Sequence, residues 1–303
     1  KRSFSHFSRK KLALVMGAQY EPQTFGQPVE RNQTSLIRTR EVEKYFRPST
    51  LPIKNILVKN SQFFEPYYEK NHKEIKLPAA LTRTPDETIL NYFSILREAE
   101  NLTENQLGGC GTVGMAKMPY PIAYSFFTKD YYKRVSYYEY LQSFAGIGHL
   151  HLIKMNRLPD EEGIVPYFIE LESIEGSSKG VTYFAYYYGY VQLQKVQNTY
   201  KIDRMKLYGE DFLCAPYHLW QHDAEAVVAI MYGEWCKLIK TQLPAKQDGY
   251  VKTIDFIGTD GAEYRFIFYQ LTNDTDVLIS QFKKDPVGNW ETIRIDPNKC
   301  VKN

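Results

Sequence analysis

The clearest pattern along the chain is the alternation of side-chain types between Val181 and Val196. Successive side chains of a strand point to opposite faces, so a strand here separates two different surfaces. One face is small and apolar, and it consists of Val181, Tyr183, Ala185, Tyr187, Gly189, Val191 and Leu193. The other is a row of aromatic and polar side chains: Thr182, Phe184, Tyr186, Tyr188, Tyr190, Gln192 and Gln194. The pattern predicts a long central strand in a curved antiparallel sheet.

Further strands are expected at residues 149–157, 165–174 and 200–208, because turn-forming residues separate these segments from the central strand. Helices come before them in the chain. Thr84-Pro85-Asp86-Glu87 combines an N-cap, a proline at the first helical position and a capping-box glutamate. Shorter helices are expected between residues 120 and 145. Helices followed by a meander of long strands predict an α+β domain with its helices on one face of the sheet.

A smaller unit is expected at the C-terminal end of the chain. Apolar residues recur at helical spacing from Ala224 to Lys240, and Leu243-Pro244 ends that helix. Four strands in a meander are then expected, at residues 250–257, 263–271, 276–283 and 290–295. The chain therefore divides into an irregular N-terminal arm at 1–83, an α+β domain at 84–217 and a smaller α+β domain at 218–303. The boundary between the last two is placed near Pro216.

The order of elements over roughly residues 84–217 resembles the nuclear transport factor 2-like superfamily. The shared features are a capped helix, an aromatic helical region and strands of increasing length. The resemblance implies a cone-shaped α+β fold with a pocket between the curved sheet and the helices. It also implies a range of functions from enzymes to non-catalytic modules, including extracytoplasmic domains of membrane-anchored bacterial proteins.

Composition narrows the function classes only slightly. The net charge of +3 over 303 residues gives no argument for nucleic-acid binding. The 25 tyrosines favour strands and binding surfaces. Four scattered cysteines without a C-x-x-C pair argue against a zinc ribbon or a thioredoxin-type site. The sequence leaves the pairing of these cysteines open: Cys110, Cys214, Cys236 and Cys300.

His149 and His151 are the clearest candidates for chemistry, because they lie two residues apart on one face of a strand. With Glu170 or Glu172 on the next strand they form either a metal site or a general base. The alternative is a pair of histidines that only make local hydrogen bonds. His218 and His222 have the spacing of helical metal ligands but lack the glutamate of a zinc-protease motif. The glycines at 108–111 are expected to form a turn rather than a phosphate-binding loop.

These features together predict a non-enzymatic extracytoplasmic or cell-surface binding module, part of a membrane-associated bacterial complex. A protein partner is expected, with a small-molecule ligand as the other possibility. No nucleic acid, catalytic residue, metal or cofactor is assigned, and membrane contact is expected only through a segment outside this chain. The expected ligand or partner surface consists of Tyr186, Tyr188, Tyr190, His149 and His151. The alternative is a dehydratase- or isomerase-type enzyme with a His-carboxylate pair in the cone cavity.

Overall fold

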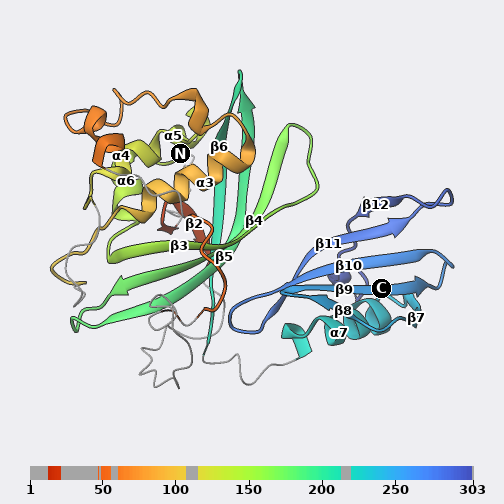
Figure 1. Ribbon diagram of the computed structural model, residues 1–303. Helices are drawn as coiled ribbons and strands as arrows, with labels where there is room; N and C mark the ends of the chain where they lie inside the picture. The colour runs from red at the N-terminus through yellow and green to blue at the C-terminus, as the bar shows by residue number, and fades with distance from the viewer. Residues whose placement is uncertain are drawn as a thin grey trace, which may run out of the picture.

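The computed structural model describes residues 13–21, 47, 49–55, 61–106, 115–212 and 220–301. It confirms the α+β class, with two six-stranded sheets and a few helices (Figure 1). The first sheet has the order β1-β2-β6-β5-β4-β3. Its strands are β1 (Leu14–Val15), β2 (Ala18–Glu21), β3 (Ile147–Arg157), β4 (Ile164–Gly176), β5 (Thr182–Val196) and β6 (Thr199–Gly209).

The predicted central strand is β5, which pairs antiparallel with β4 on one side and β6 on the other. The sheet is mixed rather than wholly antiparallel, because β2 joins β6 in parallel. Residues 14–21 therefore belong to this sheet, although the sequence placed them in an irregular arm. Burial explains the difference, since Met16 and Ala18 are almost completely inaccessible in the main core. Two apolar residues in a short hairpin give too weak a periodic signal to be found in the sequence.

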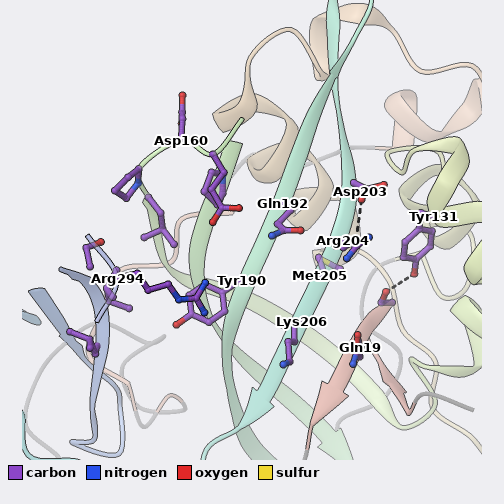
Figure 2. Close-up of a pocket in the computed structure, with 18 of the residues that line it drawn as sticks. Gln19, Tyr131, Asp160, Tyr190, Gln192, Asp203, Arg204, Met205, Lys206 and Arg294 are labelled. Atoms are coloured by element: carbon purple, nitrogen blue, oxygen red, sulfur yellow. Dashed lines mark hydrogen bonds and ion pairs between the residues drawn. The ribbon is translucent and has the colours of Figure 1, made fainter. Parts of the chain in front are cut away.

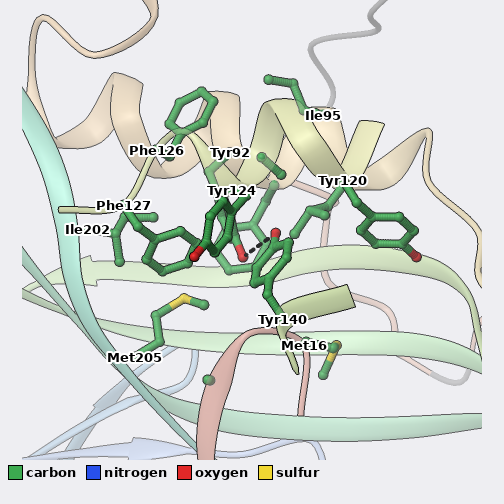
Figure 3. Packing of buried hydrophobic residues seen from close by; sticks show 14 of the residues in the cluster. Met16, Tyr92, Ile95, Tyr120, Tyr124, Phe126, Phe127, Tyr140, Ile202 and Met205 are labelled. Atoms are coloured by element: carbon green, nitrogen blue, oxygen red, sulfur yellow. Dashed lines mark hydrogen bonds between the residues drawn. The ribbon is translucent and has the colours of Figure 1, made fainter. Parts of the chain in front are cut away.

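The helices of the first unit cover one face of this sheet (Figure 1). α3 (Pro85–Arg97) begins at the predicted capping box of Thr84 and Glu87. It is followed by α4 (Pro119–Tyr124), α5 (Lys129–Arg134) and α6 (Tyr137–Gln142), and preceded by α2 (Ser61–Phe64), η1 (Glu65–Tyr67) and η2 (Ala79–Leu81). Aromatic rings fill the space between helices and sheet, and the Tyr92 and Tyr140 hydroxyls lie 3.3 Å apart within it (Figure 3).

The second sheet has the order β12-β11-β10-β9-β7, with β8 paired to β9. The four strands predicted for this unit are present. They are β9 (Val251–Gly258), β10 (Glu263–Gln270), β11 (Asp276–Lys284) and β12 (Trp290–Ile293). Two short strands, β7 (Ile239–Gln242) and β8 (Lys246–Asp248), were not predicted. The remaining elements are η4 (Trp220–His222), α7 (Ala224–Val227), the π-helix η5 (Val228–Trp235) and η6 (Pro297–Lys299).

The predicted helix at 224–240 is too long, because η5 ends at Trp235 and β7 begins at Ile239. A disulfide joins Cys236 to Cys300, directly after the helix. Lys237 then adopts a positive φ of 50°, which turns the chain away from the helical direction. Ile239 lies in a strand, but its position in the sequence continues the apolar spacing of the helix. The periodicity therefore predicted a helix that extends too far.

Several predicted features lie outside the described residues: the boundary near Pro216, the turn at 108–111, Cys110, Cys214 and His218. Over the residues that the structure does describe, no helix combines the length and the apolar character needed to cross a membrane.

Gly189 is expected to be essential for the approach of β5 to β6. A Cβ atom at this position would lie 1.9 Å from the carbonyl oxygen of Lys206, a backbone atom that cannot move aside. We expect Gly189→Ala to lower the free energy of unfolding by about 3 kcal/mol, the upper end of overpacking costs.

Gly233→Ala is the matched control, because the nearest atom to its added Cβ is a flexible side-chain carbon 3.6 Å away. Urea denaturation of both variants would measure the two effects. Equal stability of Gly189→Ala and wild type would contradict the packing of β5 on β6.

Candidate functional site

The face of the first sheet that helices α3–α6 do not cover, here called the outer face, carries an unusual number of ionisable groups. Leu171 on β4 packs in the main core with the helices, so its neighbours Glu170 and Glu172 point to the outer face. The strand register places His151 opposite Glu172, and Glu172 opposite Tyr186. Two of the predicted site residues, His151 and Tyr186, therefore meet at one carboxylate.

The Glu172 carboxylate is completely buried and accepts hydrogen bonds from three side chains. Its Oε1 atom lies 2.6 Å from Arg47 Nε and 2.9 Å from His151 Nδ1, and its Oε2 accepts from the Tyr186 hydroxyl at 2.6 Å. Burial by itself raises the pKa of Glu172, but the hydrogen bonds from His151, Tyr186 and Arg47 outweigh it and lower that pKa below its ordinary value. The carboxylate is therefore charged, with donors at both oxygens.

This cluster holds the start of residues 49–55, and the end of that segment bonds the free edge of β3. Tyr186 accepts a hydrogen bond from the Ser49 amide at 3.0 Å. Further along, Lys54 donates its amide to the Leu152 carbonyl at 2.8 Å, and the Asn55 side chain bonds both Leu150 and Leu152. The chain itself thus covers the edge of β3 at Leu150 and Leu152, an arrangement that protects this part of the sheet from pairing with other molecules.

His149 lies beside this cluster but makes no bond to the carboxylate. Its ring centroid is 4.4 Å from that of His151, and its buried Nδ1 atom has no hydrogen-bond partner among the described residues. Burial lowers the pKa of His149 to about 3, with the neighbouring His151 and Arg97 acting in the same direction. His149 is therefore neutral at physiological pH. The predicted His-carboxylate pair exists as His151 and Glu172, but on the face away from the helices.

The other two predicted residues, Tyr188 and Tyr190, lie where the second sheet packs on the outer face. They surround Phe168, whose ring centroid is 5.1 Å from that of Tyr269 on β10. Phe168, Tyr269 and Leu271 form the buried centre of this contact, and it is flanked by partly buried hydrophobic residues from both sheets. Half of the aromatic row on β5 thus packs against the second unit.

A buried ion pair between Lys154 and Glu170 lies in the same contact, with side chains that are 1% and 0% exposed. Lys154 Nζ also donates to the Gln270 carbonyl at 2.6 Å and lies 4.9 Å from the centre of the Tyr250 ring. Glu170 Oε1 accepts from the amide of Thr272 at 3.0 Å and from its hydroxyl at 2.5 Å. Each partner of the pair therefore bonds across to the second unit.

Glu210 completes this inter-sheet joint, the contact formed by the Phe168 cluster and the Lys154–Glu170 pair. Its Oε2 atom accepts a hydrogen bond from the Asn273 amide at 3.3 Å. Burial raises the pKa of Glu210 well above its ordinary value, and the nearby Glu170 carboxylate adds to the effect. Its protonated form is therefore favoured, which avoids two like charges beside a single lysine.

A cleft with a volume of about 1550 Å³ lies beside this joint (Figure 2). Its walls come from both sheets and from helices α5 and α6. Tyr190, Gln192, Arg204 and Lys206 line it on β5 and β6, and residues of β11, β12 and the segment after β12 line it from the second unit. Figure 2 shows Arg294 reaching from the second unit toward Tyr190 on the first. Tyr190 is the one member of the predicted surface that lines the cleft. Neither this cleft nor a smaller hollow at Asp223 and Asp276 is lined by His149, His151 or Glu172.

Comparisons with protein-family models, curated proteins and solved structures find no match for this chain. Across the described part of the chain, no group of three or more His, Cys, Asp or Glu residues has the arrangement to hold a metal ion.

The sequence named Glu172 as one of two possible partners of His151, but it gave no role to Arg47, Lys154 or Glu210. A signal for Lys154 was present, because a lysine stands inside the apolar segment from Leu150 to Met155 of a predicted strand. A buried charge requires a partner, so that lysine predicts an opposite charge nearby. Arg47 and Glu210 reach their partners only through tertiary contacts, which strand periodicity does not encode.

The stability of the protein should depend on pH through Glu172. Its folded-state pKa is lowered, so the charged carboxylate stabilises the fold at neutral pH and that contribution is lost as the pH falls through the folded-state pKa. We expect Glu172→Gln to cost about 2 kcal/mol at pH 7, since it weakens charge-assisted hydrogen bonds. At acidic pH the difference should shrink, because the wild-type carboxylate becomes protonated as the pH falls through its lowered folded-state pKa.

Thermal unfolding of wild type and variant from pH 7 to pH 3 measures this dependence. Glu161→Gln, a change in an exposed turn, is the control and should follow wild type at every pH. A stability gap for Glu172→Gln that stays constant over the whole range would contradict the assignment.

Proposed function

We propose that the protein is a non-enzymatic extracytoplasmic module that binds a protein partner in the cleft between its two units. The observation that carries this proposal is that the cleft has walls from both sheets, which the buried joint at Lys154 and Glu170 holds together. A site whose two walls are fixed relative to one another needs little ordering when a partner binds, and this favours affinity.

The size of the cleft supports a macromolecular partner. Pockets for small molecules usually measure about 300–1000 Å³ and enclose most of the ligand. The cleft is larger, at about 1550 Å³, and it is lined by exposed polar groups such as Arg204 and Arg294. These features suit an extended segment of another chain better than an enclosed ligand.

The histidine cluster supports a structural role over the enzyme alternative. A general base needs a free lone pair within reach of a substrate proton. Both Glu172 oxygens already accept hydrogen bonds from Arg47, His151 and Tyr186, and neither His151 nor Glu172 lines the cleft. The geometry thus supports an anchor for residues 49–55 rather than a catalytic pair.

The disulfide between Cys236 and Cys300 supports the extracytoplasmic assignment. Disulfides persist mainly in oxidising compartments, which include the bacterial periplasm and the cell surface. In the proposed arrangement the protein belongs to a membrane-associated bacterial complex and contacts the membrane only through a segment outside this chain.

Site-specific photo-cross-linking in the source organism tests the proposal. A photoreactive amino acid at Gln192 and at Ser280, one on each wall of the cleft, should give a discrete cross-linked species. Val181 and Val287 are matched control positions, because both are exposed and neither lines the cleft. Filling the cleft by Ser280→Trp should abolish the cross-link from position 192.

Cross-links of equal yield from the cleft and from the control positions would contradict the proposal. So would a cross-link from position 192 that Ser280→Trp leaves unchanged.

A further inference from the structure

We infer that Glu210 is a pH-sensitive switch at the inter-sheet joint: the two units stay docked while its carboxyl group is neutral and separate when it becomes charged. Such a switch regulates the proposed site, because separation of the units takes the walls of the cleft apart. Its effect on partner binding rests on the proposed function, whereas the switch itself does not. Three features of the joint carry it: the place of Glu210 in the chain, the charges that face it and the donors that it lacks.

Glu210 lies directly after β6, where the chain leaves the first sheet for the second unit. Its backbone amide donates to the Tyr186 carbonyl at 2.9 Å, which fixes it to β5 of the first sheet. Its side chain reaches the second unit, because Oε2 accepts from the Asn273 amide at 3.3 Å. The next residue also reaches across, since the Asp211 carbonyl accepts from the Asn273 side chain at 3.1 Å. A change at Glu210 therefore acts on both units at once.

Three carboxyl groups lie on this part of the outer face, and two of them have a cation of their own. Glu172 pairs with Arg47 at 2.6 Å, and Glu170 forms the buried pair with Lys154. Glu210 has no ion pair with any described residue. A charge on this third carboxyl group would place two buried negative charges beside one lysine, without a second cation to offset them.

Among the described residues, the groups that face Glu210 from the surrounding elements include no cation without a partner. Lys154 on β3 favours the charged form of Glu210, but it is already paired with Glu170 on β4, and Glu170 opposes that form. His222 of the second unit is bonded to the Thr275 hydroxyl at 3.4 Å. The remaining titratable groups nearby are Glu172 on β4, Tyr186 on β5, Asp211 in the same segment, and Tyr250 and the exposed Asp274 of the second unit.

The carboxyl group of Glu210 also lacks the donors that a buried carboxylate needs. Glu172 and Glu170 each accept three hydrogen bonds. Glu210 accepts from the Asn273 amide alone, and its buried Oε1 atom has no donor among the described residues. A neutral carboxyl group at this position can instead donate its proton to the Glu170 carboxylate. The docked arrangement therefore satisfies the neutral form of Glu210 and leaves the charged form unsatisfied.

The direction of the pH effect follows from this difference. In separated units water reaches Glu210, and its pKa returns to its ordinary value. In docked units burial and the Glu170 carboxylate hold that pKa well above the ordinary value. The docked state thus binds the proton more strongly, and docking is lost as the pH rises through the raised pKa. Between the two pKa values, release of one proton lowers the ratio of docked to separated units by up to about tenfold per pH unit.

Pulsed electron paramagnetic resonance from about pH 6 to about pH 10 tests the switch. Spin labels at Val181 in the first unit and Val287 in the second, both exposed, report whether the units are docked. We expect a narrow distance distribution for the wild-type protein at the acidic end and a separated population that grows toward alkaline pH. Glu210→Gln has nearly the same size but never becomes charged, so its distribution should stay narrow over the whole range.

Glu175→Gln is the matched control. Burial raises the pKa of Glu175 as well, but its carboxyl group accepts from Tyr183 and Tyr187 within the first unit. This variant should separate at alkaline pH as the wild-type protein does. Glu210→Met, which is neutral and of similar length, replaces Glu210→Gln if that variant does not fold.

A wild-type distribution that stays narrow at every pH, or separation of Glu210→Gln at the same pH as wild type, would overturn the switch. The cross-links from Gln192 and Ser280 test the proposed function separately. If the distance responds to pH but those positions give no cross-link, the switch stands and the proposed function fails. If the cross-links form but the distance does not respond to pH, the proposed function stands and the switch fails.

Discussion

The arrangement of the two units depends on one buried ion pair, between Lys154 and Glu170. Moving a charged group out of water costs several kcal/mol, so such a pair forms only where additional hydrogen bonds complete its environment. Here the completing groups, the Gln270 carbonyl and the Thr272 amide and hydroxyl, belong to the other unit. The pair is satisfied only when the second sheet is docked, and separation of the units would leave both charges without these partners.

The aromatic residues around the ion pair contribute buried apolar surface, whereas the ion pair and its hydrogen bonds fix the relative orientation of the two units. Phe168, Tyr269 and Leu271 exclude water from the joint, which strengthens the electrostatic interactions beside them. The cleft is a consequence of this arrangement, because the two sheets touch at one end of their faces and leave a gap between β5–β6 and β11–β12. The joint therefore determines both the position and the shape of the proposed binding site.

Much of the fold could be predicted from the sequence, because strand and helix periodicity is local information. The alternation from Val181 to Val196 correctly separated the face of Val191 and Leu193, which packs on the helices, from the face of Tyr188 and Tyr190, which packs on the second unit. The resemblance to the nuclear transport factor 2-like superfamily remains a prediction from element order.

The partnerships between units could not be predicted. Glu170 and Thr272 are far apart in the sequence, and nothing in the pattern around either residue indicates that they meet.

If the two units form one rigid body around the cleft, the distance between them is fixed. Val181 in the first unit and Val287 in the second are both exposed. Spin labels at these two positions report the distance by pulsed electron paramagnetic resonance. We expect a single narrow distance distribution for the wild-type protein and a broad one for Lys154→Met, which removes the cation that bonds both Glu170 and the Gln270 carbonyl. A broad distribution in the wild-type protein, or an equally narrow one in Lys154→Met, would contradict it.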